Sequence, residues 1–346
     1  MRILACHPGP SFSVSDLYDG YTAALRELGQ EVHEYNLDRR LQFYCSALLE
    51  LGERGAGGEV TIRRALGYDD AVSLALNGLL AACYRLWPDV LLVVSGLFVD
   101  EQILDCVRSR GTRVVILHTE EPYEHDRQVV LAAHADVNLV NDPTHLDAFR
   151  AVAPTWYLPH AYRPDRHHPR PPVPELVCDF GFVGTGYPSR VRFFEAVDWS
   201  GLSVRLAGNW VALPEASPLR RCLLDEPDMC LDNAQAADLY ASCRMSANIY
   251  RREANDPGYV AGWAMSPREV ELAAMGRFFL REPRGEGDEL LPMLPTFAGP
   301  EDFGEQLRWW LERPDDRAEA AGKARLAVAD RTFANHAGML LRLLGG

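Results

Sequence analysis

The chain has 346 residues, of which 47% are hydrophobic and 24% are charged, and its formal net charge is −14. This composition is typical of a soluble globular protein with about two domains, and the acidic balance argues against a broad nucleic-acid-binding surface. No apolar run reaches the ~20 residues that a membrane-spanning helix needs. The N-terminal segment is too short and polar for a signal peptide, so we expect a cytoplasmic protein.

The eight cysteines are scattered and form no C-x-x-C pair and no zinc-ligand spacing. This pattern predicts free thiols in a reducing compartment and no structural metal. Lys323 is the only lysine among the 35 basic residues. A basic side chain that contacts a phosphate must therefore be an arginine, which can bind two oxygens at once, and no mechanism through a catalytic lysine is expected.

The first half of the chain alternates strand and helix patterns, which is typical of a parallel α/β sheet. The strands are predicted at residues 3–6, 32–37, 89–94, 113–117, 137–140 and 156–158. The helices are predicted at residues 15–28, around 41–51, and at 60–86, 101–110, 129–135 and 144–152.

The segment 163–174 interrupts this alternation, because it contains five prolines and therefore disfavours both helix and central strand. We interpret it as an exposed linker, and a metal site at His167 and His168 is the less favoured alternative. After it the alternation resumes. Strands are predicted at 179–183, 204–207, 245–250 and 277–281, and helices at 190–197, 236–243, 266–276, 302–312 and over most of 315–343.

These patterns predict an α/β protein of two Rossmann-like lobes with parallel sheets, in which the ligand binds in the cleft between the lobes. The expected domains are an N-terminal lobe (1–162), the linker (163–174) and a C-terminal lobe (175–325). The final segment (326–346) is expected to be a helix that packs back toward the N-terminal lobe.

The segment from Ser266 to Gly276 carries the most informative local pattern. Ser266 can cap a helix that Glu269 completes as a capping box, and Gly276 can end that helix in the left-handed conformation. Anions bind at such helix N-termini. Arg268 and Glu271 share one face, where the arginine suits a phosphate and the glutamate suits a sugar hydroxyl. The alternative is a surface ion pair between them.

Two other strand ends in the same lobe offer groups for an anion. Gly184 and Gly186 follow a strand and allow the backbone to approach a phosphate closely, and Arg190 lies in the first turn of the next helix. The strand that contains Asn248 ends at Arg251, which we expect to face the ligand. An ordinary tight turn and solvated charge are the alternatives.

Residues 176–343 resemble, in motif order and spacing, the C-terminal lobe of GT-B glycosyltransferases, and most closely the CgeB-like (spore-maturation type) group. The similar motifs are Phe182–Arg190, Gly208–Trp210, Ala247–Arg251 and Arg268–Gly276. The resemblance extends more loosely over 112–168.

The resemblance implies that Glu271 binds the ribose hydroxyls of a nucleotide-sugar donor and that Arg268 and Arg190 bind its diphosphate. Gly184 and Gly186 would provide the close turn. Two positions depart from the family pattern: Val270 replaces an aromatic residue and Ser266 replaces an asparagine.

The resemblance also implies that the first lobe holds the acceptor. An inverting transfer needs a general base, for which His118 and Glu120 in the loop 118–126 are the candidates, followed by Asp16 at the end of the loop 7–16. A retaining transfer would need no such base. No metal and no cofactor are expected, because arginines and a helix N-terminus can stabilise the leaving group.

The predicted function is transfer of a sugar from a nucleotide diphosphate, with a UDP-sugar favoured, to an acceptor that could be a protein, a glycan, a small molecule or modified DNA. One alternative is a nucleotide-sugar epimerase of the same fold, which a glutamate–histidine pair beside the sugar would favour. Another is a non-catalytic protein that binds the nucleotide sugar.

Overall fold

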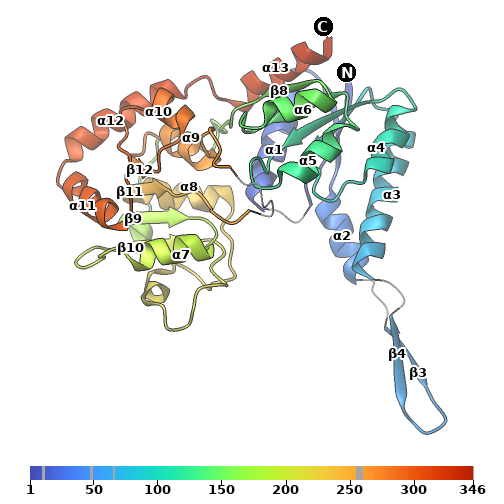
Figure 1. Cartoon of the computed structure of the whole chain (residues 1–346), viewed down its shortest axis with the longest axis horizontal. Coiled ribbons are helices and arrows are strands. Elements are labelled where there is room, and N and C mark those ends of the chain that lie inside the picture. Colours follow the sequence, from blue (N-terminus) through green and yellow to red (C-terminus); the bar gives the residue numbers. More distant parts are fainter. Residues whose placement is uncertain (10–11, 47–49, 65–66, 255–259, 346) are drawn as a thin grey trace. The chain divides into compact units, whose positions relative to one another are not determined.

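The structure is a computed structural model that describes residues 1–9, 12–46, 50–64, 67–254 and 260–345. The chain divides into two compact units. The first comprises Met1–Glu121, His125–Asn141 and His145–Tyr157, and the second comprises Pro122–Glu124, Asp142–Thr144 and Leu158–Gly346. Each unit is an α/β structure (Figure 1).

A six-stranded parallel sheet in the order β2-β1-β5-β6-β7-β8 forms the centre of the first unit. Its strands are β1 Arg2–Cys6, β2 Glu31–Tyr35, β5 Val90–Val94, β6 Arg113–His118, β7 Val137–Val140 and β8 Thr155–Tyr157. The helices of this unit are α1 Phe12–Glu27, α2 Leu37–Ser46, α3 Tyr68–Leu86, α4 Glu101–Arg108, α5 His125–Ala132 and α6 Leu146–Val152.

Burial explains why the strands of this sheet are continuously apolar. Every residue of β5 is buried, and so is every residue of β6 except Arg113. A parallel sheet is covered on both faces, so its central strands lack the polar alternation of a half-exposed strand. The predicted strands are confirmed here to within two residues at each end.

The predicted helices around 41–51 and at 60–86 are wrong in part. β3 Glu50–Arg54 and β4 Val60–Arg64 form an antiparallel hairpin between α2 and α3 (Figure 1). Gly58 adopts φ +86° in the turn, a conformation that favours glycine. The β-branched run 60–62 favours a strand over a helix. Residues 47–49 and 65–66 of the predicted helices, and residues 10–11 of the predicted loop 7–16, lie outside the described residues.

The second unit contains a four-stranded parallel sheet in the order β10-β9-β11-β12. Its strands are β9 Cys178–Val183, β10 Val204–Ala207, β11 Cys243–Asn248 and β12 Phe279–Arg281. Its helices are α7 Pro188–Glu195, α8 Asn233–Ser242, α9 Pro267–Ala274, α10 Gly285–Leu290, α11 Pro300–Leu311, α12 Pro314–Ala327 and α13 Phe333–Gly345, with short 3-10 helices at η1 Pro174–Leu176 and η2 Pro218–Cys222.

Both sheets begin with the same connectivity. In the first unit, β2 lies on one side of β1, and β5 and β6 follow on the other side. In the second unit, β10 lies on one side of β9, and β11 and β12 follow on the other side. The strand order therefore reverses beside β1 in the first unit and beside β9 in the second. In doubly wound sheets, ligands bind at this switch point, beyond the carboxyl ends of the strands.

The segment 163–174 is not the uniformly exposed linker that its prolines predict. It belongs to the second unit, and His167 is buried with 3% of its surface exposed. The amide of Arg163 donates to Nδ1 of His167 at 3.2 Å, and the His167 amide donates back to the Arg163 carbonyl at 2.7 Å. The prolines exclude helix and sheet, but the segment is ordered by this turn. His168 is exposed, as predicted.

All eight cysteines are free, and five of them are buried, two half-buried and one exposed. No helix among the described residues combines the length and the apolar character needed to cross a bilayer.

Candidate functional site

Arg268, from α9, lies at the switch point of the second sheet. Its Nη2 donates to the carbonyl of Val183, the last residue of β9, at 2.7 Å. Its Nη1 donates to Oδ1 of Asn248, the last residue of β11, at 2.8 Å. The guanidinium therefore bridges the carboxyl ends of the two strands between which the strand order reverses.

The local pattern that predicted α9 is confirmed. Ser266 caps the helix, Pro267 is its first residue, and Glu269 completes the capping box. Gly276 follows with φ +63°. Arg268 forms no ion pair with Glu271 among the described residues, so the alternative of a surface pair between them does not hold.

Arg190 is a second guanidinium at the same strand ends. It projects from the first turn of α7 and is 9% exposed. Its Nε donates to the carbonyl of Ile249 at 2.9 Å, and its Nη1 donates to that of Thr185 at 3.1 Å. These carbonyls follow β11 and β9, so Arg190 spans the same gap as Arg268, one or two residues further along each strand end.

Both arginines lie against the ring of Phe182, and neither has an acidic partner among the described residues. Their guanidinium carbons lie 5.6 Å (Arg190) and 4.5 Å (Arg268) from the centre of the Phe182 ring. Within the described chain neither forms an ion pair with a carboxylate. Burial, together with the charge of Arg268, lowers the pKa of Arg190 to about 9. Arg190 is buried and Arg268 is half-buried. Two neighbouring cations in such surroundings are costly unless an anion compensates them, so the arrangement would favour an anion.

The predicted glycines make room for this arrangement. A Cβ atom on Gly184 would lie 2.6 Å from Nη2 of Arg268, and one on Gly186 would lie 2.4 Å from the Trp210 ring. The amides of both glycines donate to backbone carbonyls, those of Ala207 at 2.9 Å and Asn209 at 2.7 Å. The glycines therefore allow close packing, and their amides are already used within the fold.

The N-termini of α7 and α9 already carry carboxylates of the protein. Glu253 accepts hydrogen bonds from the amide and the hydroxyl of Ser189 in the first turn of α7, both at 2.8 Å. Glu269 accepts from the Ser266 amide at 2.8 Å at the start of α9. Guanidinium groups, rather than helix amides, are therefore the main donors for an anion here.

Asn248 holds α9 rather than presenting its side chain to a ligand. It is fully buried. Its Oδ1 accepts from the Ser266 hydroxyl at 2.9 Å as well as from Arg268, and its Nδ2 donates to Glu269 at 3.0 Å. Burial raises the pKa of Glu269, whose Oε2 also accepts from the Tyr250 hydroxyl.

The remaining predicted donor residues lie in the second unit. The Glu271 side chain is 18% exposed, and its carboxylate lies 4.0 Å from Nε2 of His167. The guanidinium carbon of Arg251 lies 3.9 Å from the centre of the Tyr123 ring, and its Nη1 donates to the Tyr187 hydroxyl at 3.3 Å. The sequence analysis did not identify these two tyrosines.

The three candidate bases are in different environments in the first unit. His118 is 2% exposed, and its Nε2 lies 2.8 Å from Oδ1 of Asn138. Burial lowers the pKa of His118 to about 4, so it is a neutral core side chain at neutral pH. Asp16 is buried in α1, and Glu120 is half-buried after β6. Of the three, Glu120 is the most accessible.

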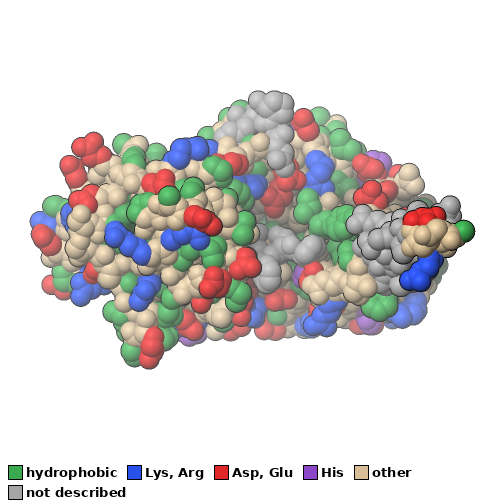
Figure 2. Space-filling model, turned by 90° about the horizontal axis from the view of Figure 1, so that it is seen from below, with side chains coloured by type: hydrophobic (Ala, Val, Ile, Leu, Met, Phe, Trp, Pro, Cys, Tyr) green, Lys and Arg blue, Asp and Glu red, His purple; other side chains and the backbone are tan. Residues whose placement is uncertain are grey.

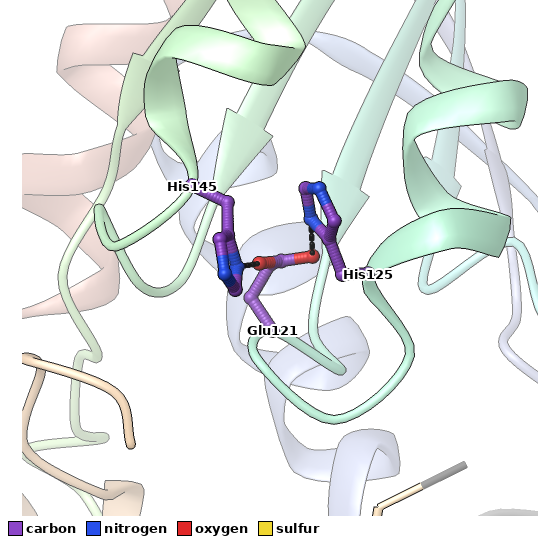
Figure 3. Close-up of side chains that lie close together, drawn as sticks. All are labelled: Glu121, His125 and His145. Carbon is purple, nitrogen blue, oxygen red and sulfur yellow. Dashed lines mark hydrogen bonds and ion pairs between the residues drawn. The ribbon is translucent and has the colours of Figure 1, made fainter. Parts of the chain in front are cut away.

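The structure also brings together a group that the sequence analysis missed. The carboxylate of Glu121 lies between the imidazoles of His125 and His145 (Figure 3). Nδ1 of His125 is 3.1 Å from Oε1, and Nδ1 of His145 is 2.9 Å from Oε2. A signal was present, because Glu121 and His145 each follow one of two consecutive buried strands, whose carboxyl ends adjoin in a parallel sheet.

Charges on one face of the second unit are mixed. On the face seen in Figure 2, acidic and basic side chains are interspersed over this unit rather than gathered by sign. Arg190 and Arg268 are thus a local cationic site in a protein of net charge −14.

Residues 190–341 match the model of a family described as glycosyl transferase-like. Among curated proteins, none matches the chain significantly in sequence.

Solved structures share the fold over nearly the whole chain. A sucrose-phosphate synthase from Thermosynechococcus elongatus aligns with a TM-score of 0.66 at 12% identity and covers 99% of both chains. A structure described as trehalose-6-phosphate from E. coli bound with UDP-2-fluoro glucose aligns with a TM-score of 0.62 at 11% identity, again over 99% of both chains. A protein assigned as a UDP-N-acetylglucosamine 2-epimerase from Listeria monocytogenes aligns with a TM-score of 0.59 at 13% identity, over 99% of this chain and 95% of that one.

At these identities the similarity establishes the fold, which is the GT-B architecture of two Rossmann-like units with parallel sheets. The family match over residues 190–341 adds sequence similarity to glycosyl transferases in the second unit. Together they indicate an enzyme that transfers a sugar.

Proposed function

We propose that this protein is a glycosyltransferase of the CgeB-like group whose second unit binds the diphosphate of a nucleotide-sugar donor, with UDP as the favoured nucleotide. The observation that carries the proposal is the pair Arg190 and Arg268, two guanidiniums at the switch point of the sheet without a carboxylate partner among the described residues. A diphosphate is an anion of matching charge, and arginine matches its geometry.

Unused donors support this assignment. A guanidinium carries five N–H groups. The hydrogen bonds of Arg190 use one hydrogen each on Nε and Nη1, and those of Arg268 use one each on Nε, Nη1 and Nη2. Both side chains are held by the fold and still retain N–H groups for phosphate oxygens.

The same groups can assist the chemistry. Breaking the bond between the sugar and the diphosphate leaves negative charge on the β-phosphate, and fixed cations stabilise that charge as it develops. We therefore propose transfer without a metal ion at the donor diphosphate. Glu271 is the proposed partner of the ribose hydroxyls, and Glu120 is the proposed base if the transfer inverts. The acceptor class remains a protein, a glycan, a small molecule or modified DNA.

Calorimetric titration with UDP, GDP, dTDP and CMP tests the donor site. We expect selective binding of UDP, weakened at least tenfold in Arg268→Ala, which corresponds to about 1.4 kcal/mol. Glu271→Ala should weaken UDP and uridine alike, whereas Arg268→Ala should weaken UDP far more than uridine, because uridine lacks the phosphates.

Arg244→Ala is the matched control for this titration. Arg244 is the second residue of β11, at the end of the strand opposite to Asn248. Its side chain is 62% exposed and pairs with Asp179. The control removes an equal charge and should leave the UDP affinity unchanged. If none of the nucleotides binds, or if Arg244→Ala and Arg268→Ala weaken UDP equally, the assignment of the donor site is wrong.

A nucleotide-sugar epimerase is the second candidate. Similarity of fold to the protein assigned as an epimerase and the 4.0 Å approach of His167 to Glu271 favour it. Incubation with UDP-N-acetylglucosamine distinguishes the two activities by proton NMR. An epimerase releases a second sugar isomer in the absence of an acceptor. A transferase instead leaves the donor unchanged or slowly releases UDP. Binding of UDP without any turnover, even with acceptors supplied, would favour the non-catalytic alternative.

A further inference from the structure

The cluster of Glu121, His125 and His145 lies at the carboxyl edge of the first sheet. Glu121 follows β6, His125 begins α5, and His145 immediately precedes α6 in the loop after β7. All three belong to the first unit. The donor site proposed above uses none of them, so the inference drawn here is independent of the proposed function.

Side-chain amides hold both the main chain and the carboxylate of Glu121. The Glu121 amide lies 3.3 Å from Oδ1 of Asn141, and Nδ2 of Asn141 donates back to the Glu121 carbonyl at 3.0 Å. Nε2 of Gln128 donates to Oε1 of Glu121 at 3.3 Å. Supporting hydrogen bonds of this kind orient the ligands of metal sites.

The three side chains offer a charge and a set of atoms that suit a divalent cation. The Glu121 side chain is fully buried, while those of His125 and His145 are 16% and 21% exposed. One ligand atom from each residue can be chosen so that all lie within 4.8 Å of one another. Ligand atoms of a tetrahedral zinc ion lie about 3.3 Å apart, given bonds of roughly 2.0–2.1 Å, so small movements would close the site.

From this geometry we propose that Glu121, His125 and His145 bind one divalent transition-metal ion, with Zn²⁺ as the best match to two imidazoles and one carboxylate. The ion replaces the two hydrogen bonds to the carboxylate. Each Nδ1 gives its lone pair to the metal, and its proton moves to Nε2 of the same ring or to solvent. Three protein ligands leave a fourth position for water on the exposed side of the histidines. This departs from the expectation, drawn from cysteine spacing, that the chain holds no metal.

Metal titration of the full-length protein tests the proposal. After treatment with a chelator and its removal, Zn²⁺ is added and followed by calorimetry, and Co²⁺ is added as a spectroscopic probe. We expect one ion per chain and a rise in the thermal unfolding temperature, because a ligand that binds only the folded state stabilises it. His145→Ala and Glu121→Gln should each weaken Zn²⁺ at least tenfold and abolish the rise.

The chain supplies a control. His134 and Asp105 form a comparable pair in the same unit, with Nδ1 2.9 Å from Oδ1, but they have no third ligand in the described chain. His134→Ala should leave Zn²⁺ affinity unchanged. The Co²⁺ spectrum should lack thiolate charge-transfer bands, which would instead reveal binding at the free cysteines.

Circular dichroism and urea unfolding without metal establish that each variant is folded, and His125→Ala replaces any variant that is not. The proposal is overturned if Zn²⁺ binds wild type and His145→Ala equally, if it binds through thiolates, or if it does not bind. The cluster would then be a hydrogen-bonded group that only holds the loop after β6.

Discussion

Arg268 contributes to the candidate site through its position in the sheet rather than through its helix alone. It hydrogen-bonds Val183, which is 85 residues away in the sequence, and Asn248, which is 20 residues away. Because the carboxyl ends of β9 and β11 both accept from one guanidinium, the cation has a fixed place. A fixed cation loses little conformational entropy when it binds an anion.

Gly208 provides a stability prediction at the scale of one residue. It has φ +105°, and a Cβ atom there would lie 2.6 Å from the carbonyl oxygen of Gly184. Gly208→Ala should therefore lower the free energy of unfolding by roughly 2–4 kcal/mol, from overpacking and backbone strain together. Gly201→Ala is the control, because φ is +74° there but no atom lies within 4 Å of the added Cβ. Urea unfolding should show the smaller loss for Gly201→Ala, and equal losses would contradict the steric argument.

At the scale of elements, the hydrogen bonds around Asn248 join helix α9 to strand β11. Asn248 contacts the cap residue Ser266, the arginine of the site and the buried Glu269. The N-terminal cap of the helix and the arginine of the candidate site are therefore held by the same side chain. This explains why a capping pattern and a binding motif coincide in one short segment.

Asn248→Ala tests this connection. It removes partners from the buried Glu269 and from Arg268, and we expect a loss of roughly 2–4 kcal/mol in stability together with weaker UDP binding. Asn335→Ala, which removes an exposed hydrogen bond to the Asp330 carbonyl, should change the stability by less than about 1 kcal/mol. Unfolding curves and UDP titrations provide the two readouts. An unchanged UDP affinity in a folded Asn248→Ala protein would mean that Asn248 does not position the arginine.

At the scale of the whole molecule, both units bury neutral histidines. Burial is the largest cause that lowers the pKa of His118 in the first unit, and of His160 and His336 in the second, to about 4 from the ordinary value of 6.5. The unfolded chain therefore takes up protons at these positions before the folded chain does. The contribution of these neutral histidines to the free energy of unfolding is fully present above about pH 6.5. It is lost as the pH falls from about 6.5 toward about 4.

We expect each of these histidines to cost roughly 2 kcal/mol of stability between pH 7 and pH 5. In His118→Gln, whose amide can still pair with Asn138, the loss of stability on acidification should shrink by about that amount. His33→Gln, at a half-exposed position paired with Glu31, is the control and should follow wild type. Urea unfolding at the two pH values measures the difference. A His118→Gln protein as acid-sensitive as wild type would contradict the assignment of His118 as a buried neutral group.

Local patterns in the sequence were sufficient to predict most of the elements. The apolar runs of β5 and β6, the capping box at Ser266 and Glu269, and the glycine after α9 each specify a structure within a few residues of themselves. Short-range propensity and the burial of both sheet faces produce those patterns. The hairpin β3–β4 was missed because its strands are short and adjoin helical patterns.

Only the tertiary structure decided which of these residues meet. Sequence patterns could not show that His118 and His167 are buried, or that the amides of Gly184 and Gly186 are used within the fold. The order of the strands places Glu121 and His145 at adjoining strand ends, but only the structure shows that their side chains meet, 24 residues apart. Each of these facts depends on which strand ends adjoin and which side chains cover them. The sequence by itself therefore determined most of the elements, the α/β class and the arginines available for an anion. The folded chain decided their pairing and protonation, because burial and long-range contacts set both.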